Sequence, residues 1–224
     1  MKKTNRKYSH QGRPPAKESE GRRERILDSA LTLFAGHGIA GTTIAQIAKD
    51  SGVTSAMVHY YFGNREGLLD AIAAERLAPA IEYIWAGVSE EALAEPRRIV
   101  TEFVDRLLEA VEKMPQLPQL WSREILNPGG MLRERLLTLV PLERLATVIS
   151  ALSLAQQKGT VNPMISPPLV MTSIMAVVML PITAWDMLGK IPIMPALDKE
   201  VLRHHALALL LDGLCPEKSR EGQQ

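Results

Sequence analysis

The sequence has little cysteine, few aromatic residues and almost no net charge. Its single cysteine, Cys215, excludes an intramolecular disulfide and a metal site built from cysteines. The 26 Lys and Arg residues against 25 Asp and Glu residues give a net charge of +1, which argues against a uniformly basic nucleic-acid coat protein and against an acidic solvating chain. Aromatic residues make up 4% of the chain and hydrophobic residues 46%. This composition, rich in Leu and Ala, predicts a globular chain of one or two domains and favours helices over sheets.

The sequence also lacks a secretion signal, because the basic residues near its start are followed by polar residues and not by an apolar segment. We therefore expect a cytoplasmic protein. One uncharged run challenges this expectation, since its 27 residues, 159–185, exceed the roughly 20 that a membrane span needs. Prolines and polar residues interrupt the run. We expect a helix buried in a core or in an oligomer interface and no membrane partner, and a membrane span is the alternative.

The charged residues are unevenly distributed along the chain. Residues 1–25 carry a net charge of +6, and the other 199 residues carry a net charge of −5. Because glycine and proline accompany the basic residues, we expect a flexible basic arm over 1–21. Such an arm is either a solvated tail or a segment that binds phosphates.

Four helical patterns follow the arm. Apolar residues at helical spacing predict a first helix over 22–36, and Thr42 is expected to cap a second helix of barely two turns. Thr54 is expected to cap a third helix over 55–61, and Asn64 a longer fourth helix. Two short helices joined by a glycine-containing turn are typical of a helix-turn-helix, whose second helix presents its first residues to base edges in the major groove of DNA.

The segment Ile26–Leu69, ILDSALTLFAGHGIAGTTIAQIAKDSGVTSAMVHYYFGNREGLL, resembles the DNA-binding domain of TetR-family transcriptional regulators. The motifs LFAGHG, TTIAQIAKDSGV, YYF and NREGLL carry the resemblance by their fixed order. The resemblance implies an all-α fold in which an N-terminal three-helix helix-turn-helix domain is followed by a larger helical ligand-binding and dimerisation domain. The expected boundaries are 22–68 for the first domain, 69–214 for the second, and 215–224 for a flexible tail.

The resemblance also implies which residues meet DNA. Ser55, Ala56 and Met57 occupy the base-reading start of the recognition helix, although Met57 could instead fill space in the core. Phosphates are expected at Thr43 and Arg65, the latter replacing the more usual lysine, whereas Tyr61 is expected to pack. The full expected set is Thr42, Thr43, Thr54, Ser55, Ala56, Met57, His59, Tyr60 and Arg65, with His59 standing where most members have a tyrosine.

The rest of the chain has helical patterns but no comparably specific motif. The patterns predict that the fourth helix continues to Val88, and that further helices follow over 96–113 and 120–126. The next helical stretch is expected to break near Pro141 and to resume through 155. The last two helices are expected over 168–188 and 198–212. In the TetR family the last two helices form a four-helix dimer bundle. The resemblance therefore implies a homodimer through 168–188 and 198–212, which accounts for the uncharged run better than a membrane does.

Large apolar side chains on the middle helices suggest a pocket for a small molecule. The candidate pocket residues are Trp85, Phe103, Met114, Trp121, Met175, Met179 and Trp185, although methionines at helical spacing are also common in cores. These residues predict an apolar or amphipathic effector, whose identity the sequence does not specify.

Catalytic and metal-binding patterns are scarce. Glu200 and His204 at i,i+4 offer only two metal ligands, and the sequence has no phosphate-binding loop or nucleophile elbow. We therefore expect no enzyme, no cofactor and no metal. The sequence predicts a ligand-responsive repressor released from a palindromic DNA operator. Alternatives are an activator or co-repressor-dependent regulator of the same fold, and a membrane-associated helical interaction protein.

Overall fold

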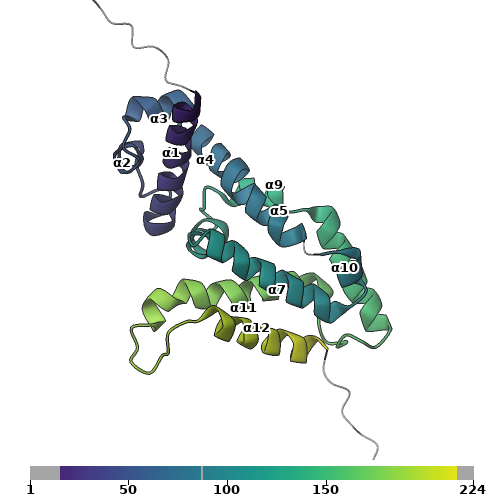
Figure 1. The fold of residues 1–224 in the computed structure, drawn as a ribbon. Coiled ribbons are helices and arrows are strands. Elements are labelled where there is room, and N and C mark those ends of the chain that lie inside the picture. Colours follow the sequence, from purple (N-terminus) through teal and green to yellow (C-terminus); the bar gives the residue numbers. More distant parts are fainter. Residues whose placement is uncertain (1–15, 87, 216–224) are drawn as a thin grey trace, which may run out of the picture.

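The computed structural model describes residues 16–86 and 88–215, which form helices joined by loops, with no β-strand in this part of the chain (Figure 1). Two elements, η1 and η2, are π-helical turns. In chain order the elements are α1 (Ala16–His37), α2 (Ile44–Asp50), α3 (Ser55–Phe62), α4 (Arg65–Ile72), η1 (Ala73–Leu77), α5 (Ala78–Ala86), α6 (Glu90–Leu93), α7 (Pro96–Lys113), α8 (Leu117–Leu120), η2 (Trp121–Ile125), α9 (Arg133–Leu139), α10 (Leu142–Gln157), α11 (Pro167–Leu188) and α12 (Lys199–Leu214). The all-α fold expected from the sequence is confirmed.

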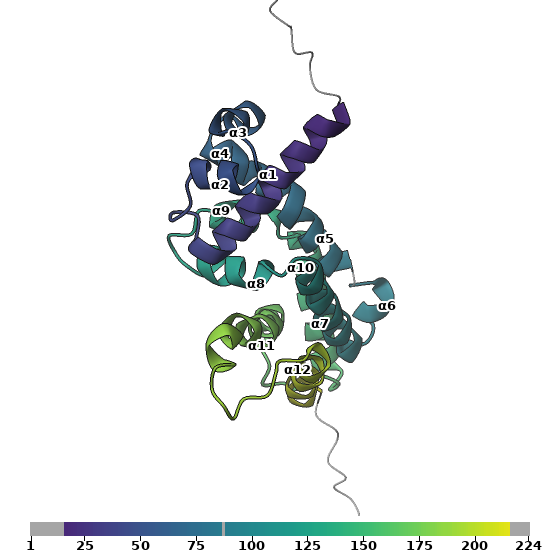
Figure 2. The same cartoon turned by 60° about the vertical axis from the view of Figure 1, so that its left-hand side comes forward.

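The three N-terminal helices form a small domain at one end of the molecule, and α4 leads from it into the larger helical part (Figures 1 and 2). Helix α1 begins at Ala16, so the expected flexible arm over 1–21 is wrong for its last six residues. The hydroxyls of Ser19 and Tyr61 lie 3.0 Å apart, which anchors this early part of α1 to α3. Residues 1–15 of the expected arm lie outside the described residues.

Helix α7 is at the centre of the larger part and packs against α5, α11 and α12. Its bounds confirm the helix predicted over 96–113. Ile99, Phe103 and Leu107 of α7 are almost fully buried, because its apolar residues recur on one face. This helix therefore organises the core on which the other helices of the domain pack.

Several expected boundaries differ from the structure. The expected fourth helix is divided into α4, η1 and α5 and ends at Ala86, and α6 was not expected. The helix expected over 120–126 consists of α8 and η2 and ends at Ile125. The expected break near Pro141 is confirmed, since α9 and α10 meet there at 65°. Helix α12 extends to Leu214, and Asp198 caps it through hydrogen bonds from the N–H groups of Glu200 and Val201.

Helices α11 and α12 lie side by side at the end opposite the N-terminal domain (Figures 1 and 2). The segment 167–185 is long and apolar enough to cross a membrane, with a mean hydropathy of 1.8, yet only 28% of its most apolar stretch is buried. Large apolar side chains remain exposed on both helices, among them Leu169, Leu180 and Leu209. This end of the molecule is therefore an extended apolar surface.

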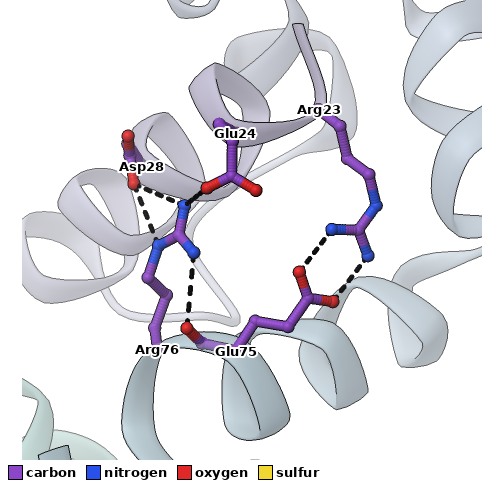
Figure 3. A network of polar contacts seen from close by, with 5 residues as sticks. All are labelled: Arg23, Glu24, Asp28, Glu75 and Arg76. Atoms are coloured by element: carbon purple, nitrogen blue, oxygen red, sulfur yellow. Dashed lines mark hydrogen bonds and ion pairs between the residues drawn. The ribbon is translucent and has the colours of Figure 1, made fainter. Parts of the chain in front are cut away.

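Ion pairs attach the segment formed by α4 and η1 to α1 on one side and to α9 on the other. Figure 3 shows Arg76 of η1 between Glu24 and Asp28 of α1, and the guanidinium of Arg23 paired with both carboxylate oxygens of Glu75. The hydrogen bonds from Arg23 lower the pKa of Glu75 below its ordinary value. On the other side, Arg135 of α9 bonds Glu66 and Asp70 of α4 at 2.7 and 2.6 Å. The α4–η1 segment is thus held from both sides.

Candidate DNA-binding surface and ligand pocket

Helix α3 has one face in the core and one face in solvent. Val58 and Phe62 are buried, whereas Ser55, Ala56 and His59 are exposed and Met57 is half-buried. The Oγ1 atom of Thr54 accepts a hydrogen bond from the N–H group of Met57 at 3.3 Å, which confirms the expected cap. Tyr60 is the most exposed aromatic group of this helix, with 76% of its surface accessible. The first turn of α3 therefore presents small and polar side chains to solvent.

The cap of α2 is Thr43, and the expected cap at Thr42 is wrong. The Thr43 hydroxyl accepts from the N–H group of Gln46, and the Gln46 side chain accepts from the N–H group of Thr43 at 2.7 Å, a reciprocal capping box. Thr42 is 1% exposed and its hydroxyl donates to the carbonyl of Gly38 at 2.8 Å. Burial therefore removes Thr42 from the expected DNA contacts, whereas Thr43 remains exposed. The spacing of Thr43 and Gln46 is the sequence signal that identifies this cap.

Arg65 is directed toward the interior of the domain. Its Nη2 atom donates to the carbonyl oxygens of Ile39 and Thr42, the latter at 2.7 Å. Arg65 therefore fastens the start of α4 to the loop between α1 and α2. A phosphate contact by Arg65 stays a prediction, and in this structure the guanidinium is engaged within the protein.

His59 bonds to the backbone at the end of its own helix. The Nδ1 atom lies 3.0 Å from the carbonyl oxygen of Gly63, and since a carbonyl only accepts, Nδ1 carries the hydrogen. The Nε2 atom is then left for other partners. Gly63 ends the helix with a φ of 73°, in the left-handed region where a side chain would add strain. This glycine allows the sharp turn from α3 to α4.

The larger helical part contains an apolar cavity of about 330 Å³ that is partly open to solvent. Five of the seven expected pocket residues line it, and Met114 and Trp185 do not. The rings of Trp85 and Phe103 meet edge to face, with centroids 5.3 Å apart. The full lining is Leu77, Ile81, Ile84, Trp85, Phe103, Leu117, Leu120, Trp121, Ile125, Leu126, Leu136, Leu137, Val140, Leu145, Pro168, Met171, Thr172, Met175 and Met179.

The lining of the cavity contains no charged side chain, and Thr172 supplies its one aliphatic hydroxyl. Sequence reasoning missed the leucines and isoleucines of the lining, because an aliphatic residue facing a cavity has the same helical spacing as one facing the core. Among the described residues, no cluster of three or more His, Cys, Asp or Glu side chains could hold a metal ion. The cavity can therefore enclose a ligand by apolar contact but offers no counter-ion.

The N-terminal domain matches a known family. Residues 26–72 fit the model of the bacterial regulatory proteins of the tetR family. The N-terminal domain therefore belongs to the TetR family. The matched segment runs from α1 to the end of α4 and so includes the whole capped arrangement of α2 and α3.

Curated relatives of this chain are regulators, and they are similar to it over a limited segment. The HTH-type transcriptional regulator SrpR of Pseudomonas putida is 39% identical over 67 residues, which is 30% of this chain and 32% of SrpR. The HTH-type transcriptional repressor KstR2 of Rhodococcus jostii is 39% identical over 62 residues, which is 26% of this chain and 30% of KstR2. The chain thus matches about a third of the length of these relatives.

A solved structure extends the likeness of fold to the second domain. The transcriptional regulator FadR of Bacillus subtilis, solved in complex with stearoyl-CoA, has a TM-score of 0.61 and 21% sequence identity to this chain. The superposition covers 85% of this chain and 98% of FadR. At this identity the comparison establishes the fold of the larger helical part.

Proposed function

We propose that this chain is a sequence-specific DNA-binding regulator, and that it acts as a repressor released from DNA by a neutral apolar molecule. The observation that carries the proposal is the solvent-facing first turn of α3, with Ser55 and Ala56 exposed and Val58 buried behind them. Small side chains at this place allow a helix to approach base edges in the major groove. Thr43, Thr54, Met57, His59 and Tyr60 complete the proposed contact surface.

The ligand class follows from the cavity lining. A charged ligand group buried there would have no ionic partner among the lining residues, and burial of an unpaired charge is strongly unfavourable. FadR was solved with stearoyl-CoA, whose acyl chain is apolar although its CoA part is charged, so this relative supports only the apolar part of the proposed ligand class. KstR2 is named a repressor, which supports repression here. The alternatives use the same DNA-binding surface and the same cavity. An activator would raise transcription when it is bound to DNA, and a co-repressor-dependent regulator would bind DNA more tightly when the cavity is occupied.

The exposed apolar surface of α11 and α12 supports a homodimer. A second copy that covers Leu169, Leu180 and Leu209 would remove these side chains from water. Two recognition helices would then face two half-sites of one operator. The different-class alternative is a membrane-associated protein, and flotation of the purified chain with lipid vesicles would favour it over the dimer.

The DNA contacts are tested by fluorescence anisotropy on duplexes that the wild-type chain enriches from a random pool. We expect Ser55→Ala to change the base preference at one position of each half-site, because Ser55 lies at the start of α3. Ser150→Ala on the exposed side of α10 is the matched control and should bind as the wild type does. If Ser55→Ala and the control bind every duplex equally well, α3 does not read bases.

The ligand class is tested with N-phenylnaphthylamine, a neutral apolar fluorophore, and with its sulfonated derivative. We expect the neutral compound to bind the cavity and to quench tryptophan fluorescence, because Trp85 and Trp121 line it. The sulfonate should bind at least about tenfold more weakly, since it carries a charge that the cavity cannot pair. Equal affinity for both compounds would contradict a neutral ligand class.

A further inference from the structure

Glu124 is a buried charged residue that the proposed DNA surface and the proposed pocket do not use. It lies in the π turn η2 and is 6% exposed. Its Oε1 atom accepts a hydrogen bond from the N–H group of Ile39 at 3.1 Å, and its Oε2 atom accepts from the N–H group of Met131 at 2.9 Å. Both carboxylate oxygens are therefore committed to backbone groups.

The two backbone partners belong to different domains. Ile39 lies in the loop between α1 and α2, inside the DNA-binding domain. Met131 lies just before α9 in the larger helical part, and Leu136 and Leu137 of α9 line the cavity. The residues around Glu124 line the cavity as well, because Trp121, Ile125 and Leu126 all contribute to its wall. One carboxylate thus joins the wall of the cavity to the DNA-binding domain.

The link continues beyond Ile39. Its carbonyl oxygen accepts from Arg65, which also bonds the carbonyl of Thr42 next to the proposed contact Thr43. The peptide groups on both sides of Ile39 are therefore held, one by Glu124 and the other by the first residue of α4. Movement of the Glu124 carboxylate would shift the loop that carries Thr43 and the start of α4 together.

The backbone around Glu124 is closely packed. A Cβ atom at Gly130 would collide with the carbonyl oxygen of Glu124, so only glycine allows the segment after η2 to fold back over this residue. A π turn holds an extra residue in the helix and is frequent at functional sites. The Glu124 side chain therefore belongs to a local irregularity of the helix, and the neighbouring residues Trp121 and Ile125 of the same turn line the cavity.

We propose that Glu124 is the positioning residue that couples occupancy of the cavity to DNA binding. The inference rests on the proposed function, since it concerns how ligand and DNA sites communicate. A ligand that contacts Trp121 and Ile125 displaces η2, and the Glu124 carboxylate then releases or pulls the N–H group of Ile39. The loop between α1 and α2 moves, and the spacing of the DNA contacts changes with it.

The test compares DNA binding of the full chain with and without saturating N-phenylnaphthylamine. We expect the compound to weaken binding of the wild type to its selected duplex by at least about fivefold, at the lower end of allosteric coupling. In Glu124→Gln the amide nitrogen faces an N–H donor, so at least one of the two hydrogen bonds is lost. This variant should bind the compound as tightly as the wild type. Addition of the compound should then change the DNA affinity of the variant by less than about twofold.

Glu134→Gln, on the exposed side of α9, is the matched control and should keep the full response. If Glu124→Gln retains it too, Glu124 does not couple the sites and the proposed function stands. If the wild type binds duplex and compound with no mutual effect, the coupling is refuted while DNA binding stands. If the wild type selects no duplex at all, the proposed function itself fails.

A measurement on the wild type covers the case in which Glu124→Gln does not fold. We expect amide hydrogen exchange in the peptide spanning 36–42 to become faster when N-phenylnaphthylamine binds, because the Ile39 N–H group loses its acceptor. Exchange that is unchanged in this peptide, in a protein whose DNA affinity falls on binding the compound, would refute the role of Glu124.

Discussion

At the scale of single residues, two adjacent threonines have separate tasks. The Thr42 hydroxyl is buried and donates to Gly38, while the Thr43 hydroxyl is exposed and caps α2. Only Thr43 has a glutamine three residues later, Gln46, and the sequence prediction overlooked this capping-box signal when it chose Thr42. The structure separates them by burial, and burial determines which hydroxyl can reach a phosphate.

This difference predicts distinct effects for two isosteric substitutions. Thr42→Val and Thr43→Val should each lower the free energy of unfolding by about 1 kcal/mol, because each removes a hydrogen bond or a cap. Only Thr43→Val should weaken DNA binding, by about tenfold, because valine cannot donate a hydrogen bond to a phosphate. Chemical denaturation and anisotropy titrations measure the two effects. Equal weakening of DNA binding in both variants would contradict the assignment.

At the scale of elements, the sequence predicted most helices and missed the irregular ones. Helix α7 was predicted with its observed bounds because its apolar face has a regular helical period. The π turns η1 and η2 contain neither glycine nor proline, so their own residue types do not mark them. Five of the seven residues predicted for the pocket line the cavity, since aromatic and sulfur-containing side chains are conspicuous in a sequence. The role of Glu124, in contrast, depends on Ile39, 85 residues away. Long-range contacts of this kind have no sequence period.

The ion pair between α1 and η1 predicts a pH dependence of stability. The pKa of Glu75 is lowered by its hydrogen bonds from Arg23, so the carboxylate stabilises the folded chain above the ordinary value of about 4.3. This contribution is lost as the pH falls through the lowered pKa. Glu75→Gln should therefore be less stable than the wild type by about 0.5 to 1 kcal/mol at pH 7, and the difference should shrink as the pH falls below the ordinary pKa. Thermal unfolding over a series of pH values measures this, and a difference that does not shrink with falling pH would contradict it.

At the scale of the whole molecule, charge and apolar surface are separated along the chain. The net charge of +1 conceals a positive segment over 1–25, next to the DNA-binding domain, and a negative remainder. The apolar surface of α11 and α12 lies at the opposite end (Figure 1). This arrangement fits a dimer that joins at one end and approaches DNA with the other.

The dimer predicts the effect of a charge on α11. Leu180 is 59% exposed in the single chain, so Leu180→Glu would bury a carboxylate in the proposed interface. We expect a monomer by light scattering and at least about tenfold weaker DNA binding, because the second half-site is no longer tethered. Leu154→Glu on α10, where the leucine is 50% exposed, should remain dimeric. A dimeric Leu180→Glu variant would place the interface elsewhere.

The basic segment predicts a salt effect. Deletion of residues 1–15 removes five basic side chains and no acidic one, while α1 is kept intact. We expect the dependence of the logarithm of DNA affinity on the logarithm of salt concentration to become less steep, by about 0.9 for each phosphate that these side chains neutralise in the wild type. An unchanged slope would assign these residues to a solvated tail.

The most direct test of the central claim is selection of duplexes from a random DNA pool by the full chain, followed by sequencing. The proposed dimer predicts an enriched inverted repeat whose half-sites lie about one helical turn, roughly 34 Å, apart or a multiple of it. A pool with no enriched motif after repeated rounds would contradict a sequence-specific regulator.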